Sequence, residues 1–572
     1  MGAGTFGRTL GLAAACLWSG CGSGSSAPEG SAKRSATANP NKGVESAKSA
    51  PMPDRPVTAG KHPNILYVLS DDQRAESIAC MPKLRELMGP NAVTFKRHFA
   101  ATPLCCPARS TILTGLYAHH HRVLANADIE EDDREERTNG ALDFQKNGNE
   151  ERVFPKWLQQ VGYWTGIYGK YLNDYDDLLA ATPRYVPPYW DDFHVFPQAA
   201  FYDFELEERS PGEKTARRRC FVSDVKTRKK QEKKCRKSAD EVIDDGNENF
   251  STDVLAERAI TFIRQATKQG KPWFVYFAPW APHSPYTSPA RYQPDPAKAE
   301  FTKAAMDRLG NCSLFEWKDR PASFLEADVS DKPDWVQEAA RKKHPADKLD
   351  DHRKEQLVSV LATEDAMESI FKVLDELGIK DDTIVVYHGD NGYAWGEHHH
   401  PAKNCTYEGC SLIPLMIRDP AVTHATAPLD ALTVNIDIAP TFADWAGASA
   451  PKVDGLSLVK LLRGEAPNWP RQEVLTECWG TGKKGHADVQ ASVRTTRWKY
   501  VEHYDDPERT KIHVHSKGGP DLELYDLQAD PFELDNLLRL DEAGLRRTGH
   551  TKAEVEVQRS ALEKRLHALE VE

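Results

Sequence analysis

The sequence contains no long hydrophobic run and no excess of positive charge. Its apolar stretch at residues 10–18 is too short to span a bilayer, since a transmembrane helix needs about 20 apolar residues. Lys and Arg number 74 against 86 Asp and Glu, which gives a formal net charge of -12. Because nucleic-acid binding needs a basic face that neutralises phosphates, this balance argues against nucleic acid as a partner. A chain of 572 residues with 40% hydrophobic residues is instead expected to bury at least one large core.

The first sixty residues have the composition of a leader followed by a linker. Arg8 precedes the short apolar run, which leads into Ser19-Gly20-Cys21. This end resembles the lipobox of bacterial lipoproteins, in which an acylated Cys21 would anchor the chain to a membrane. Trp18 stands where leucine is usual, so plain secretion is an equal alternative. We expect a signal peptide in residues 1–21, a flexible linker in residues 22–60, and an exported protein that is secreted, periplasmic or a cell-surface lipoprotein.

Export permits disulfides among the remaining cysteines. Cys220 and Cys235 flank one polar segment and are the first predicted pair, and Cys405 and Cys410 are a second. The sequence does not determine the pairing by itself.

Short apolar runs that end abruptly in polar residues recur along the chain, at residues 64–70, 163–168, 272–278 and 383–388. Runs of this kind are typical of strands buried on both faces of a parallel sheet. Residues 251–269 and 357–377 carry apolar positions at helical spacing before two of these runs. The alternation predicts an α/β fold with a large, mostly parallel central sheet flanked by helices.

Polar and charged residues follow these predicted strands directly. In such a sheet the carboxyl ends of the strands share one crevice, where ligands bind. The residues expected there are Asp71, Asp72, Lys170, His283, Asp390 and Asn391. Their carboxylates and amide oxygen are hard ligands suited to Ca²⁺ or Mg²⁺, and a divalent cation would relieve the repulsion among the carboxylates.

A cationic set accompanies these carboxylates. Arg109, Lys170 and Lys403, with His283, could hold the oxygens of a small oxyanion ester and stabilise the charge that develops on them. Arg109 lies in Cys105-Cys106-Pro107-Ala108-Arg109-Ser110, where Pro107 suggests that a helix begins and places Cys105 near its N-terminus. Each residue taken singly has an ordinary structural interpretation; Cys105, for instance, could be a buried thiol or half of a disulfide.

Further blocks accompany this hexapeptide. They are residues 64–73, Leu113-Thr114-Gly115, Gly169-Lys170, Pro282-His283, Gly389-Asp390-Asn391-Gly392, Gly396-Glu397-His398 with Lys403 and Tyr407-Glu408, Val493-Arg494-Thr495, Trp498-Lys499-Tyr500 and Glu523-Leu524-Tyr525-Asp526-Leu527. In this order, over residues 62–540, they resemble the formylglycine-dependent sulfatases of the alkaline phosphatase superfamily. The shorter stretches Gly169-Lys170-Tyr171-Leu172-Asn173 and Ala281-Pro282-His283-Ser284-Pro285 are most similar to N-acetylglucosamine-6-sulfatase and the extracellular heparan sulfate endosulfatases.

The resemblance implies an alkaline phosphatase-like catalytic domain in residues 61–465 and a smaller α+β subdomain with an antiparallel sheet in residues 466–572. It implies hydrolysis of sulfate esters, with a sulfated carbohydrate such as a 6-O-sulfated glucosamine unit as substrate. A formylglycine-generating enzyme would convert Cys105 to formylglycine. One divalent metal, Ca²⁺ or alternatively Mg²⁺, would be bound by Asp71, Asp72, Asp390, Asn391 and the modified Cys105.

The resemblance also implies roles for the remaining site residues. Arg109 would orient the nucleophile and Asp390 would help to activate it. Lys170, Lys403 and His283 would hold the sulfate, and His283 or a lysine would protonate the leaving alcohol. One residue departs from the pattern. Many sulfatases have a histidine two residues after the lysine matched by Lys170, but this chain has Leu172, so the breakdown of a sulfated intermediate needs another group or lacks this assistance.

Three charged segments have no place in this scheme. Residues 213–237 hold twelve Lys or Arg and three Asp or Glu, which suits either a basic hairpin that attracts a polyanionic glycan or a solvated insertion without a ligand. For the acidic run at residues 130–136 and the triplet His398-His399-His400, a solvated segment without a ligand is the favoured interpretation. His398 could approach the site, but a separate metal site in the triplet is not expected.

Two other function classes remain open. Relatives with the same cysteine motif act on phosphorus, so a phosphonate monoester or phosphodiester hydrolase is an alternative. A catalytically silent glycan-binding lipoprotein is another, if Cys105 stays unmodified.

Overall fold

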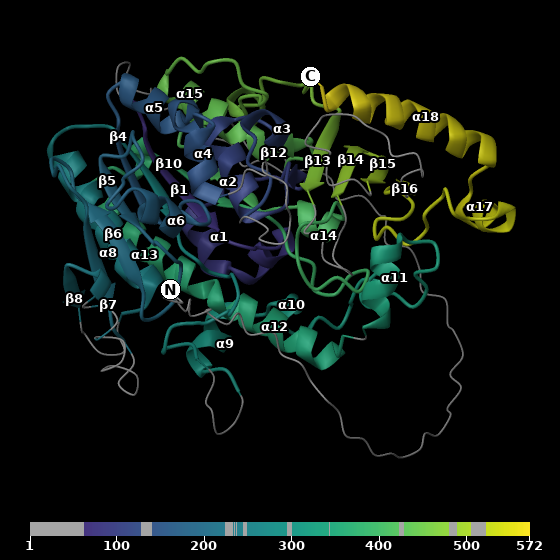
Figure 1. Ribbon diagram of the computed structural model, residues 1–572, viewed down its shortest axis with the longest axis horizontal. Coiled ribbons are helices and arrows are strands. Elements are labelled where there is room, and N and C mark those ends of the chain that lie inside the picture. The colour runs from purple at the N-terminus through teal and green to yellow at the C-terminus, as the bar shows by residue number, and fades with distance from the viewer. Residues whose placement is uncertain are drawn as a thin grey trace, which may run out of the picture. The chain divides into compact units, whose positions relative to one another are not determined.

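A computed structural model of the protein describes residues 62–126, 140–223, 233, 235, 237–243, 249–293, 300–342, 344–422, 428–479, 489–504 and 522–571 (Figure 1). The predicted leader with Cys21, the linker, the acidic run at residues 130–136 and part of the basic segment lie outside these residues. Among the helices of the described part, none combines the length and the apolar character needed to cross a bilayer.

A mixed sheet of ten strands forms the centre of the fold. In spatial order its strands are β2 (Val93–Thr94), β11 (Leu415–Arg418), β10 (Thr383–Gly389), β1 (Asn64–Ser70), β9 (Trp273–Ala278), β4 (Trp164–Gly169), β5 (Asp192–Val195), β6 (Glu205–Arg209), β7 (Arg217–Phe221) and β8 (Glu241–Ile243). The five strands from β10 to β5 run parallel, and antiparallel strands flank them on both sides. The predicted fold class is confirmed, and each of the four apolar runs forms one of the parallel strands.

Seventeen α-helices accompany the sheets in the described residues. They are α1 (Pro82–Met88), α2 (Cys105–Thr114), α3 (Ala118–His121), α4 (Gly140–Lys146), α5 (Phe154–Gln160), α6 (Tyr175–Ala181), α8 (Ser251–Lys268), α9 (Lys303–Leu309), α10 (Ser313–Glu316), α11 (Asp334–Arg341), α12 (Ala346–Ser359), α13 (Leu361–Glu376), α14 (Glu408–Ser411), α15 (Ile438–Ala446), α16 (Val459–Leu462), α17 (Glu542–Thr548) and α18 (Lys552–Leu569).

Strand β1 explains why the sheet carries helices on both faces. Its side chains alternate, so Ile65, Tyr67 and Leu69 enter one core while Leu66 and Val68 enter the other. The first core includes residues of α2, α5 and α15, and the second includes residues of α8 and α13. A strand buried on both faces needs no polar side, which is why residues 64–70 form a continuous apolar run.

The helix predicted over residues 357–377 is divided into two. Helix α12 ends at Ser359 and α13 begins at Leu361. At the junction the Thr363 N–H donates to Val360 O at 2.9 Å, and the Ser359 hydroxyl donates to Thr287 O at 3.0 Å, outside the helix. Apolar spacing continues across the junction because both helices contribute to cores, so spacing alone does not reveal the break.

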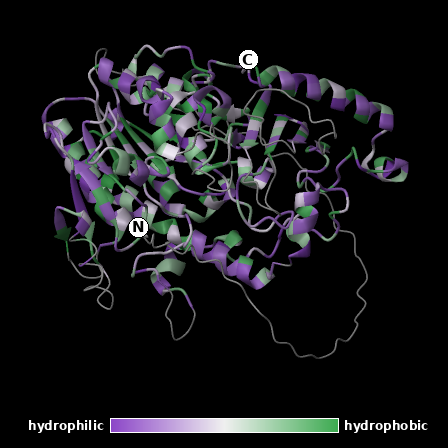
Figure 2. Cartoon of the chain, in the orientation of Figure 1, coloured by the Kyte–Doolittle hydropathy of each residue, from purple (hydrophilic) through white to green (hydrophobic). Residues whose placement is uncertain are grey.

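A separate antiparallel sheet follows in the C-terminal part, in the order β13 (Glu473–Trp479), β14 (Val489–Thr495), β15 (Trp498–Tyr504) and β16 (Leu522–Asp526). Helix α18 packs on β14 and β15 through Val555, Leu562 and Leu566. Figure 2 shows this helix as mostly hydrophilic with scattered hydrophobic residues, as expected for a helix that covers a sheet with one face. The boundary at residue 465 stays a prediction, since the residues described here belong to one compact unit.

Three disulfides are present in the described part of the chain, and they join six cysteines. Both predicted pairs, Cys220 with Cys235 and Cys405 with Cys410, are present. The third pair, Cys80 with Cys312, was not predicted and joins residues 232 positions apart. No local pattern signals such a pair, because only the packing of the chain brings the two cysteines together.

Glu364 in α13 is a buried acid away from the predicted crevice. The Leu84 N–H donates to its Oε1 at 2.7 Å, and Arg308 Nε lies 3.7 Å from its Oε2. Burial raises the pKa of Glu364 to about 7, although the Leu84 hydrogen bond and the Arg308 charge oppose this rise. The folded protein therefore holds a proton there that the unfolded chain releases near pH 4.5.

We expect Glu364→Gln to stabilise the protein at pH 8 but not at pH 4.5. Since the folded-state pKa lies above the unfolded one, the stability of the wild type falls as the pH rises from about 4.5 to about 7, by up to about 3 kcal/mol. Thermal unfolding of both proteins at the two pH values measures the effect. The control is Glu257→Gln, which makes the same change at an exposed position. An equal Tm difference at both pH values would contradict it.

Candidate active site

The predicted crevice lies where β1, β9 and β10 end. Ser70 of β1 pairs with Gly389 of β10. The Asp390 N–H donates to Ser70 O at 3.1 Å, and the Asp72 N–H donates to Asp390 Oδ1 at 3.1 Å. The Asp71 N–H donates to Ala281 O at 3.2 Å, beyond the end of β9. Parallel pairing thus brings aspartates more than 300 positions apart in sequence into direct contact, from the Asp72 backbone to the Asp390 carboxylate.

Cys105 lies at the first position of α2, which confirms that it lies at the N-terminus of a helix. The preceding Leu104 is extended, and the Cys106 N–H donates to Asn126 Oδ1 at 2.8 Å. The thiol is fully buried and lies 3.3 Å from Asp71 Oδ1. Burial, followed by the Asp71 charge, raises the pKa of the Cys105 thiol well above its ordinary value, although two lysines oppose the rise. As encoded, this cysteine is therefore a protonated and poor nucleophile.

Arg109 follows one helical turn after Cys105 and is also fully buried. Its Nε donates to Asp390 Oδ2 at 2.9 Å, its Nη1 donates to Lys170 O at 2.8 Å, and its Nη2 lies 3.4 Å from Asp71 Oδ2. One guanidinium therefore connects the ends of β1, β4 and β10. Such a planar fork holds two carboxylates in fixed directions, whereas an ammonium group lacks this planar arrangement of donors.

Two lysines and a histidine complete the cluster. Lys170 Nζ donates to Asp71 Oδ2 at 2.6 Å, while Lys403 Nζ donates to Asp72 Oδ1 and to Cys105 Sγ, the latter at 2.7 Å. His283 Nε2 lies 3.5 Å from Asp72 Oδ2.

These cations control the ionisation of the two adjacent aspartates. Burial alone would raise the pKa of Asp71 and of Asp72. The charge of Lys170 on Asp71 and that of Lys403 on Asp72, each supported by His283, outweigh burial and hold both pKa values below their ordinary range. Asp390 differs, because burial and the Asp71 charge raise its pKa despite Arg109. The three carboxylates repel one another, which is the situation that a bound cation relieves.

Asn391 provides the test of whether a divalent cation fits. Its Nδ2 donates to Asp72 Oδ1 at 2.8 Å and to Gly392 O at 2.9 Å. No donor within the described residues reaches the buried Oδ1 of the same side chain. Ligand atoms of Asp71, Asp72, Cys105 and His283 lie within 4.8 Å of one another. A buried, unpaired oxygen beside carboxylates suits a hard cation such as Ca²⁺ or Mg²⁺.

The structure thus brings together every predicted site residue, and their chemical roles stay predictions. The sequence reasoning missed Gln356 of α12, whose Nε2 donates to the Asp72 carbonyl at 3.3 Å. It also missed Tyr286 and Tyr393, whose hydroxyl oxygens lie 2.9 Å apart. Tyr286 comes three residues after His283, a proximity that could have drawn attention to it, but Gln356 belongs to no recognisable motif.

The other charged features have structural partners. His398 Nδ1 contacts Glu326 Oε2 at 2.7 Å, outside the cluster. In the described part of the basic segment, Arg218 pairs with Glu207 at 2.9 Å and Arg219 with Glu208 at 2.8 Å. These contacts favour the structural interpretation for both features.

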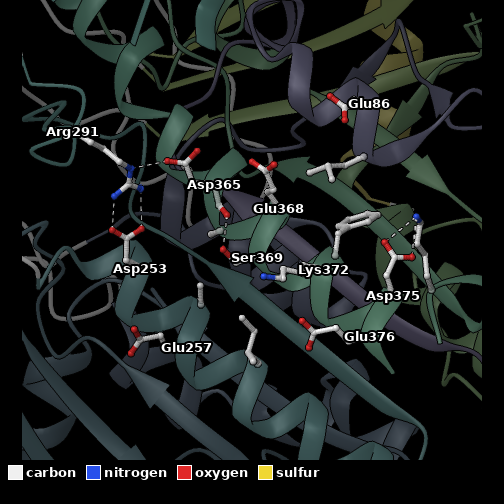
Figure 3. Close-up of a pocket in the computed structure, with 16 residues that line it drawn as sticks. Glu86, Asp253, Glu257, Arg291, Asp365, Glu368, Ser369, Lys372, Asp375 and Glu376 are labelled. Carbon is white, nitrogen blue, oxygen red and sulfur yellow. Dashed lines mark hydrogen bonds and ion pairs between the residues drawn. The ribbon is translucent and has the colours of Figure 1, made fainter. Parts of the chain in front are cut away.

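A groove of about 1080 Å³ between α8 and α13 is lined by many acidic residues but by none of the site residues. Figure 3 shows Arg291 between Asp253 and Asp365, to which it donates at 2.7 Å and 2.8 Å. Lys380 and Asp375 pair in the same groove at 3.1 Å. Because many of its charges neutralise one another, we do not assign a ligand to this groove.

Comparisons with known proteins show the family of this chain. The family model described as Sulfatase matches residues 63–448, which includes all of the site residues. A second model, described as N-sulphoglucosamine sulphohydrolase, C-terminal, matches residues 396–556.

Characterised relatives align over most of the chain. An arylsulfatase of Volvox carteri is 26% identical over 85% of this chain and 73% of its own length. The N-acetylglucosamine-6-sulfatase of Capra hircus is 27% identical over 84% of this chain and 80% of its own. An extracellular sulfatase SULF-1 homolog of Drosophila melanogaster is 27% identical over 72% of this chain, which spans only 32% of that longer protein.

Solved structures show the same fold. One is a protein in complex with its substrate D-glucosamine-2-N,6-O-disulfate, with a TM-score of 0.60 and 23% identity over 89% of this chain and 97% of the other. Another is the phosphonate monoester hydrolase of Agrobacterium radiobacter, with a TM-score of 0.55 and 21% identity over 87% of this chain and 95% of the other. From the family model and the assembled site together, the chain belongs to the sulfatase family and is a sulfuric ester hydrolase.

Proposed function

We propose that this protein hydrolyses a sulfate ester of a carbohydrate, with a 6-O-sulfated glucosamine unit as the expected substrate. The observation that carries the proposal is the convergence of Lys170, Lys403 and His283 on the two carboxylates that adjoin Cys105. Such a cluster of donors suits the oxygens of a small anion. The substrate class is supported by the names of relatives that act on N-acetylglucosamine 6-sulfate groups and by the glucosamine disulfate bound to a protein of the same fold.

The site is proposed to contain two groups that the encoded chain does not supply. Asp71, Asp72, Asp390 and Asn391 would hold one divalent cation, with Ca²⁺ preferred to Mg²⁺, and Cys105 would be converted to formylglycine by a formylglycine-generating enzyme. When present, the cation polarises the ester oxygens and the formylglycine supplies a hydrated aldehyde as the nucleophile. The encoded thiol is buried and protonated and is therefore a poor nucleophile. Conversion to formylglycine would give this position a side chain that can attack the ester.

The residues around the nucleophile have separable tasks. Arg109 holds Asp71 and Asp390 in position through its guanidinium. Lys170 and Lys403, which both act electrostatically on the Cys105 side chain, would donate to the sulfate oxygens and stabilise charge in the transition state.

His283 would protonate the leaving alcohol. Its Nδ1 lies 2.7 Å from Ser284 O, and a carbonyl only accepts, so Nδ1 carries a proton. Nε2 is therefore the nitrogen that faces the site and exchanges a proton there. Leu172, at the position where many sulfatases have a histidine, is buried in the core. Since leucine cannot assist a proton transfer, the breakdown of the sulfated intermediate either lacks this assistance or receives it from another group, for which we propose His283.

The proposal is tested with enzyme produced together with a formylglycine-generating enzyme. We expect kcat/KM for 4-nitrophenyl sulfate to exceed that for a matched 4-nitrophenyl phosphodiester by roughly 100-fold, and sulfate to be released from glucosamine 6-O-sulfate. A preference for the phosphodiester would instead support a phosphorus ester hydrolase. Peptide mass spectrometry across residues 100–115 tests the third alternative, because an unmodified Cys105 in an inactive protein would support a catalytically silent glycan-binding protein. An unmodified Cys105 in active preparations would instead exclude formylglycine as the nucleophile.

A further inference from the structure

Tyr286 lies close to the candidate active site and has no role in the proposed chemistry. Its N–H donates to His283 O at 3.0 Å, so one turn carries both side chains. Its φ of 57° lies in the left-handed region, which a bulky residue seldom adopts and which costs on the order of 1 kcal/mol. Strain of this kind is often retained where a side chain must point in a particular direction.

The surroundings of Tyr286 connect it to the catalytic cluster. The ring of His352 lies 5.6 Å from the Tyr286 ring, and Gln356, one turn further along α12, donates to the Asp72 carbonyl at 3.3 Å. Burial and then Tyr393 raise the pKa of the Tyr286 phenol, with a further rise from Asp72 and a smaller opposing effect from Lys403. The phenol is therefore protonated at neutral pH, and the charges of Asp72 and Lys403 act on it.

The direction of the hydrogen bonds decides what Tyr286 can offer to a substrate. The Tyr393 hydroxyl donates to Pro401 O at 3.2 Å, and a phenol has only one proton. In the 2.9 Å contact between the two hydroxyls, Tyr286 must therefore be the donor and Tyr393 the acceptor. The proton of Tyr286 is therefore used in the hydrogen bond to Tyr393. The Tyr286 oxygen keeps lone pairs that can accept a hydrogen bond from a substrate.

We propose that Tyr286 is a specificity-determining residue whose phenol oxygen accepts a hydrogen bond from a hydroxyl or N–H group of the sulfated sugar. This inference rests on the proposed function and adds a selection rule to it. A sugar with a hydroxyl or N–H at that position donates a hydrogen bond to the Tyr286 oxygen. A second sulfate or a carboxylate at that position needs a donor, which Tyr286 cannot provide. A buried acceptor without a partner is costly, so the site discriminates against sugars that lack the donor.

The experiment combines the variant Tyr286→Phe with substrates that lack single donors. The parent substrate is the sugar sulfate that the wild type turns over faster, of the 3-O- and 6-O-sulfates of glucosamine, and each analogue lacks one hydroxyl or the amino group. We expect Tyr286→Phe to lower kcat/KM about 10-fold for the parent, and one analogue to show a similar loss with the wild type. For that analogue, the variant should cause no additional loss. Tyr189→Phe, which removes a hydroxyl that donates to Glu151 at 2.8 Å, serves as the matched control.

The outcomes separate this inference from the proposed function. Equal losses for the parent and all analogues would mean that the Tyr286 hydroxyl has only a structural role, and would overturn the inference while sulfate hydrolysis stands. If the enzyme hydrolyses 4-nitrophenyl sulfate but none of the sugar sulfates, the inference is also overturned. If neither class is turned over, the proposed function fails as well. Tyr393→Phe is the second variant, because it frees the Tyr286 proton, and we expect the preference to move towards sugars with an acceptor at the selected position.

Discussion

Cys105→Ala is expected to abolish sulfate ester hydrolysis, with a loss in kcat of roughly 10⁴-fold or more. The reason is that the remaining cluster can bind and polarise an ester but has no group to attack it. Cys105→Ser should lose as much, although serine keeps a hydroxyl at the same place, because the encoded oxygen has no second hydroxyl with which to release the sulfate. Initial rates with 4-nitrophenyl sulfate measure both variants.

Cys106→Ala is the matched control for this prediction. Cys106 is buried in the core beside the nucleophile and contacts none of the charged groups through its side chain in the interactions described above. It should retain most of the activity and still yield formylglycine at position 105 by peptide mass spectrometry. Near wild-type activity in Cys105→Ser would contradict the proposed nucleophile, since the proposed formylglycine is made from the cysteine at this position.

Arg109→Met is expected to lower the free energy of unfolding by about 3 to 5 kcal/mol, because it removes one partner from a buried charge cluster. Arg109 has no exposed surface, and its loss leaves the carboxylates of Asp71 and Asp390 without the guanidinium that connects them. Urea denaturation of the wild type and the variant gives the difference. Arg109→Lys should lie between them, since an ammonium restores the charge but not the fork.

Arg471→Met separates stability from catalysis. Arg471 forms a buried ion pair with Asp437, outside the active-site cluster. Its loss should also destabilise the protein, but the folded fraction should keep its activity, whereas folded Arg109→Met should be inactive as well. Identical urea midpoints for wild type and Arg109→Met would show that the buried cluster does not depend on this arginine.

Local sequence predicted those elements whose signal is short-range. Residues 64–70 are apolar because both faces of β1 are buried, and the strand has those bounds. Cys105 begins α2, as expected from Pro107 two residues later, since proline is compatible with the first helical turn. The pair Cys80 with Cys312 was missed, because their separation of 232 residues leaves no local signal.

The sequence by itself determined which chemical groups this protein can use: the carboxylates at the ends of strands, Lys170 and His283 that follow other strands, a cysteine at the start of a helix, and Lys403 in a separate motif. It also determined that the groups at strand ends share one edge, because parallel strands end together. Only the tertiary structure decided which groups touch. Lys170 pairs with Asp71, Lys403 reaches Cys105, and the Tyr286 hydroxyl contacts that of Tyr393. The physical reason is that side-chain contacts depend on the packing of segments far apart in the chain, and hydrogen bonds need positions accurate to a few tenths of an ångström.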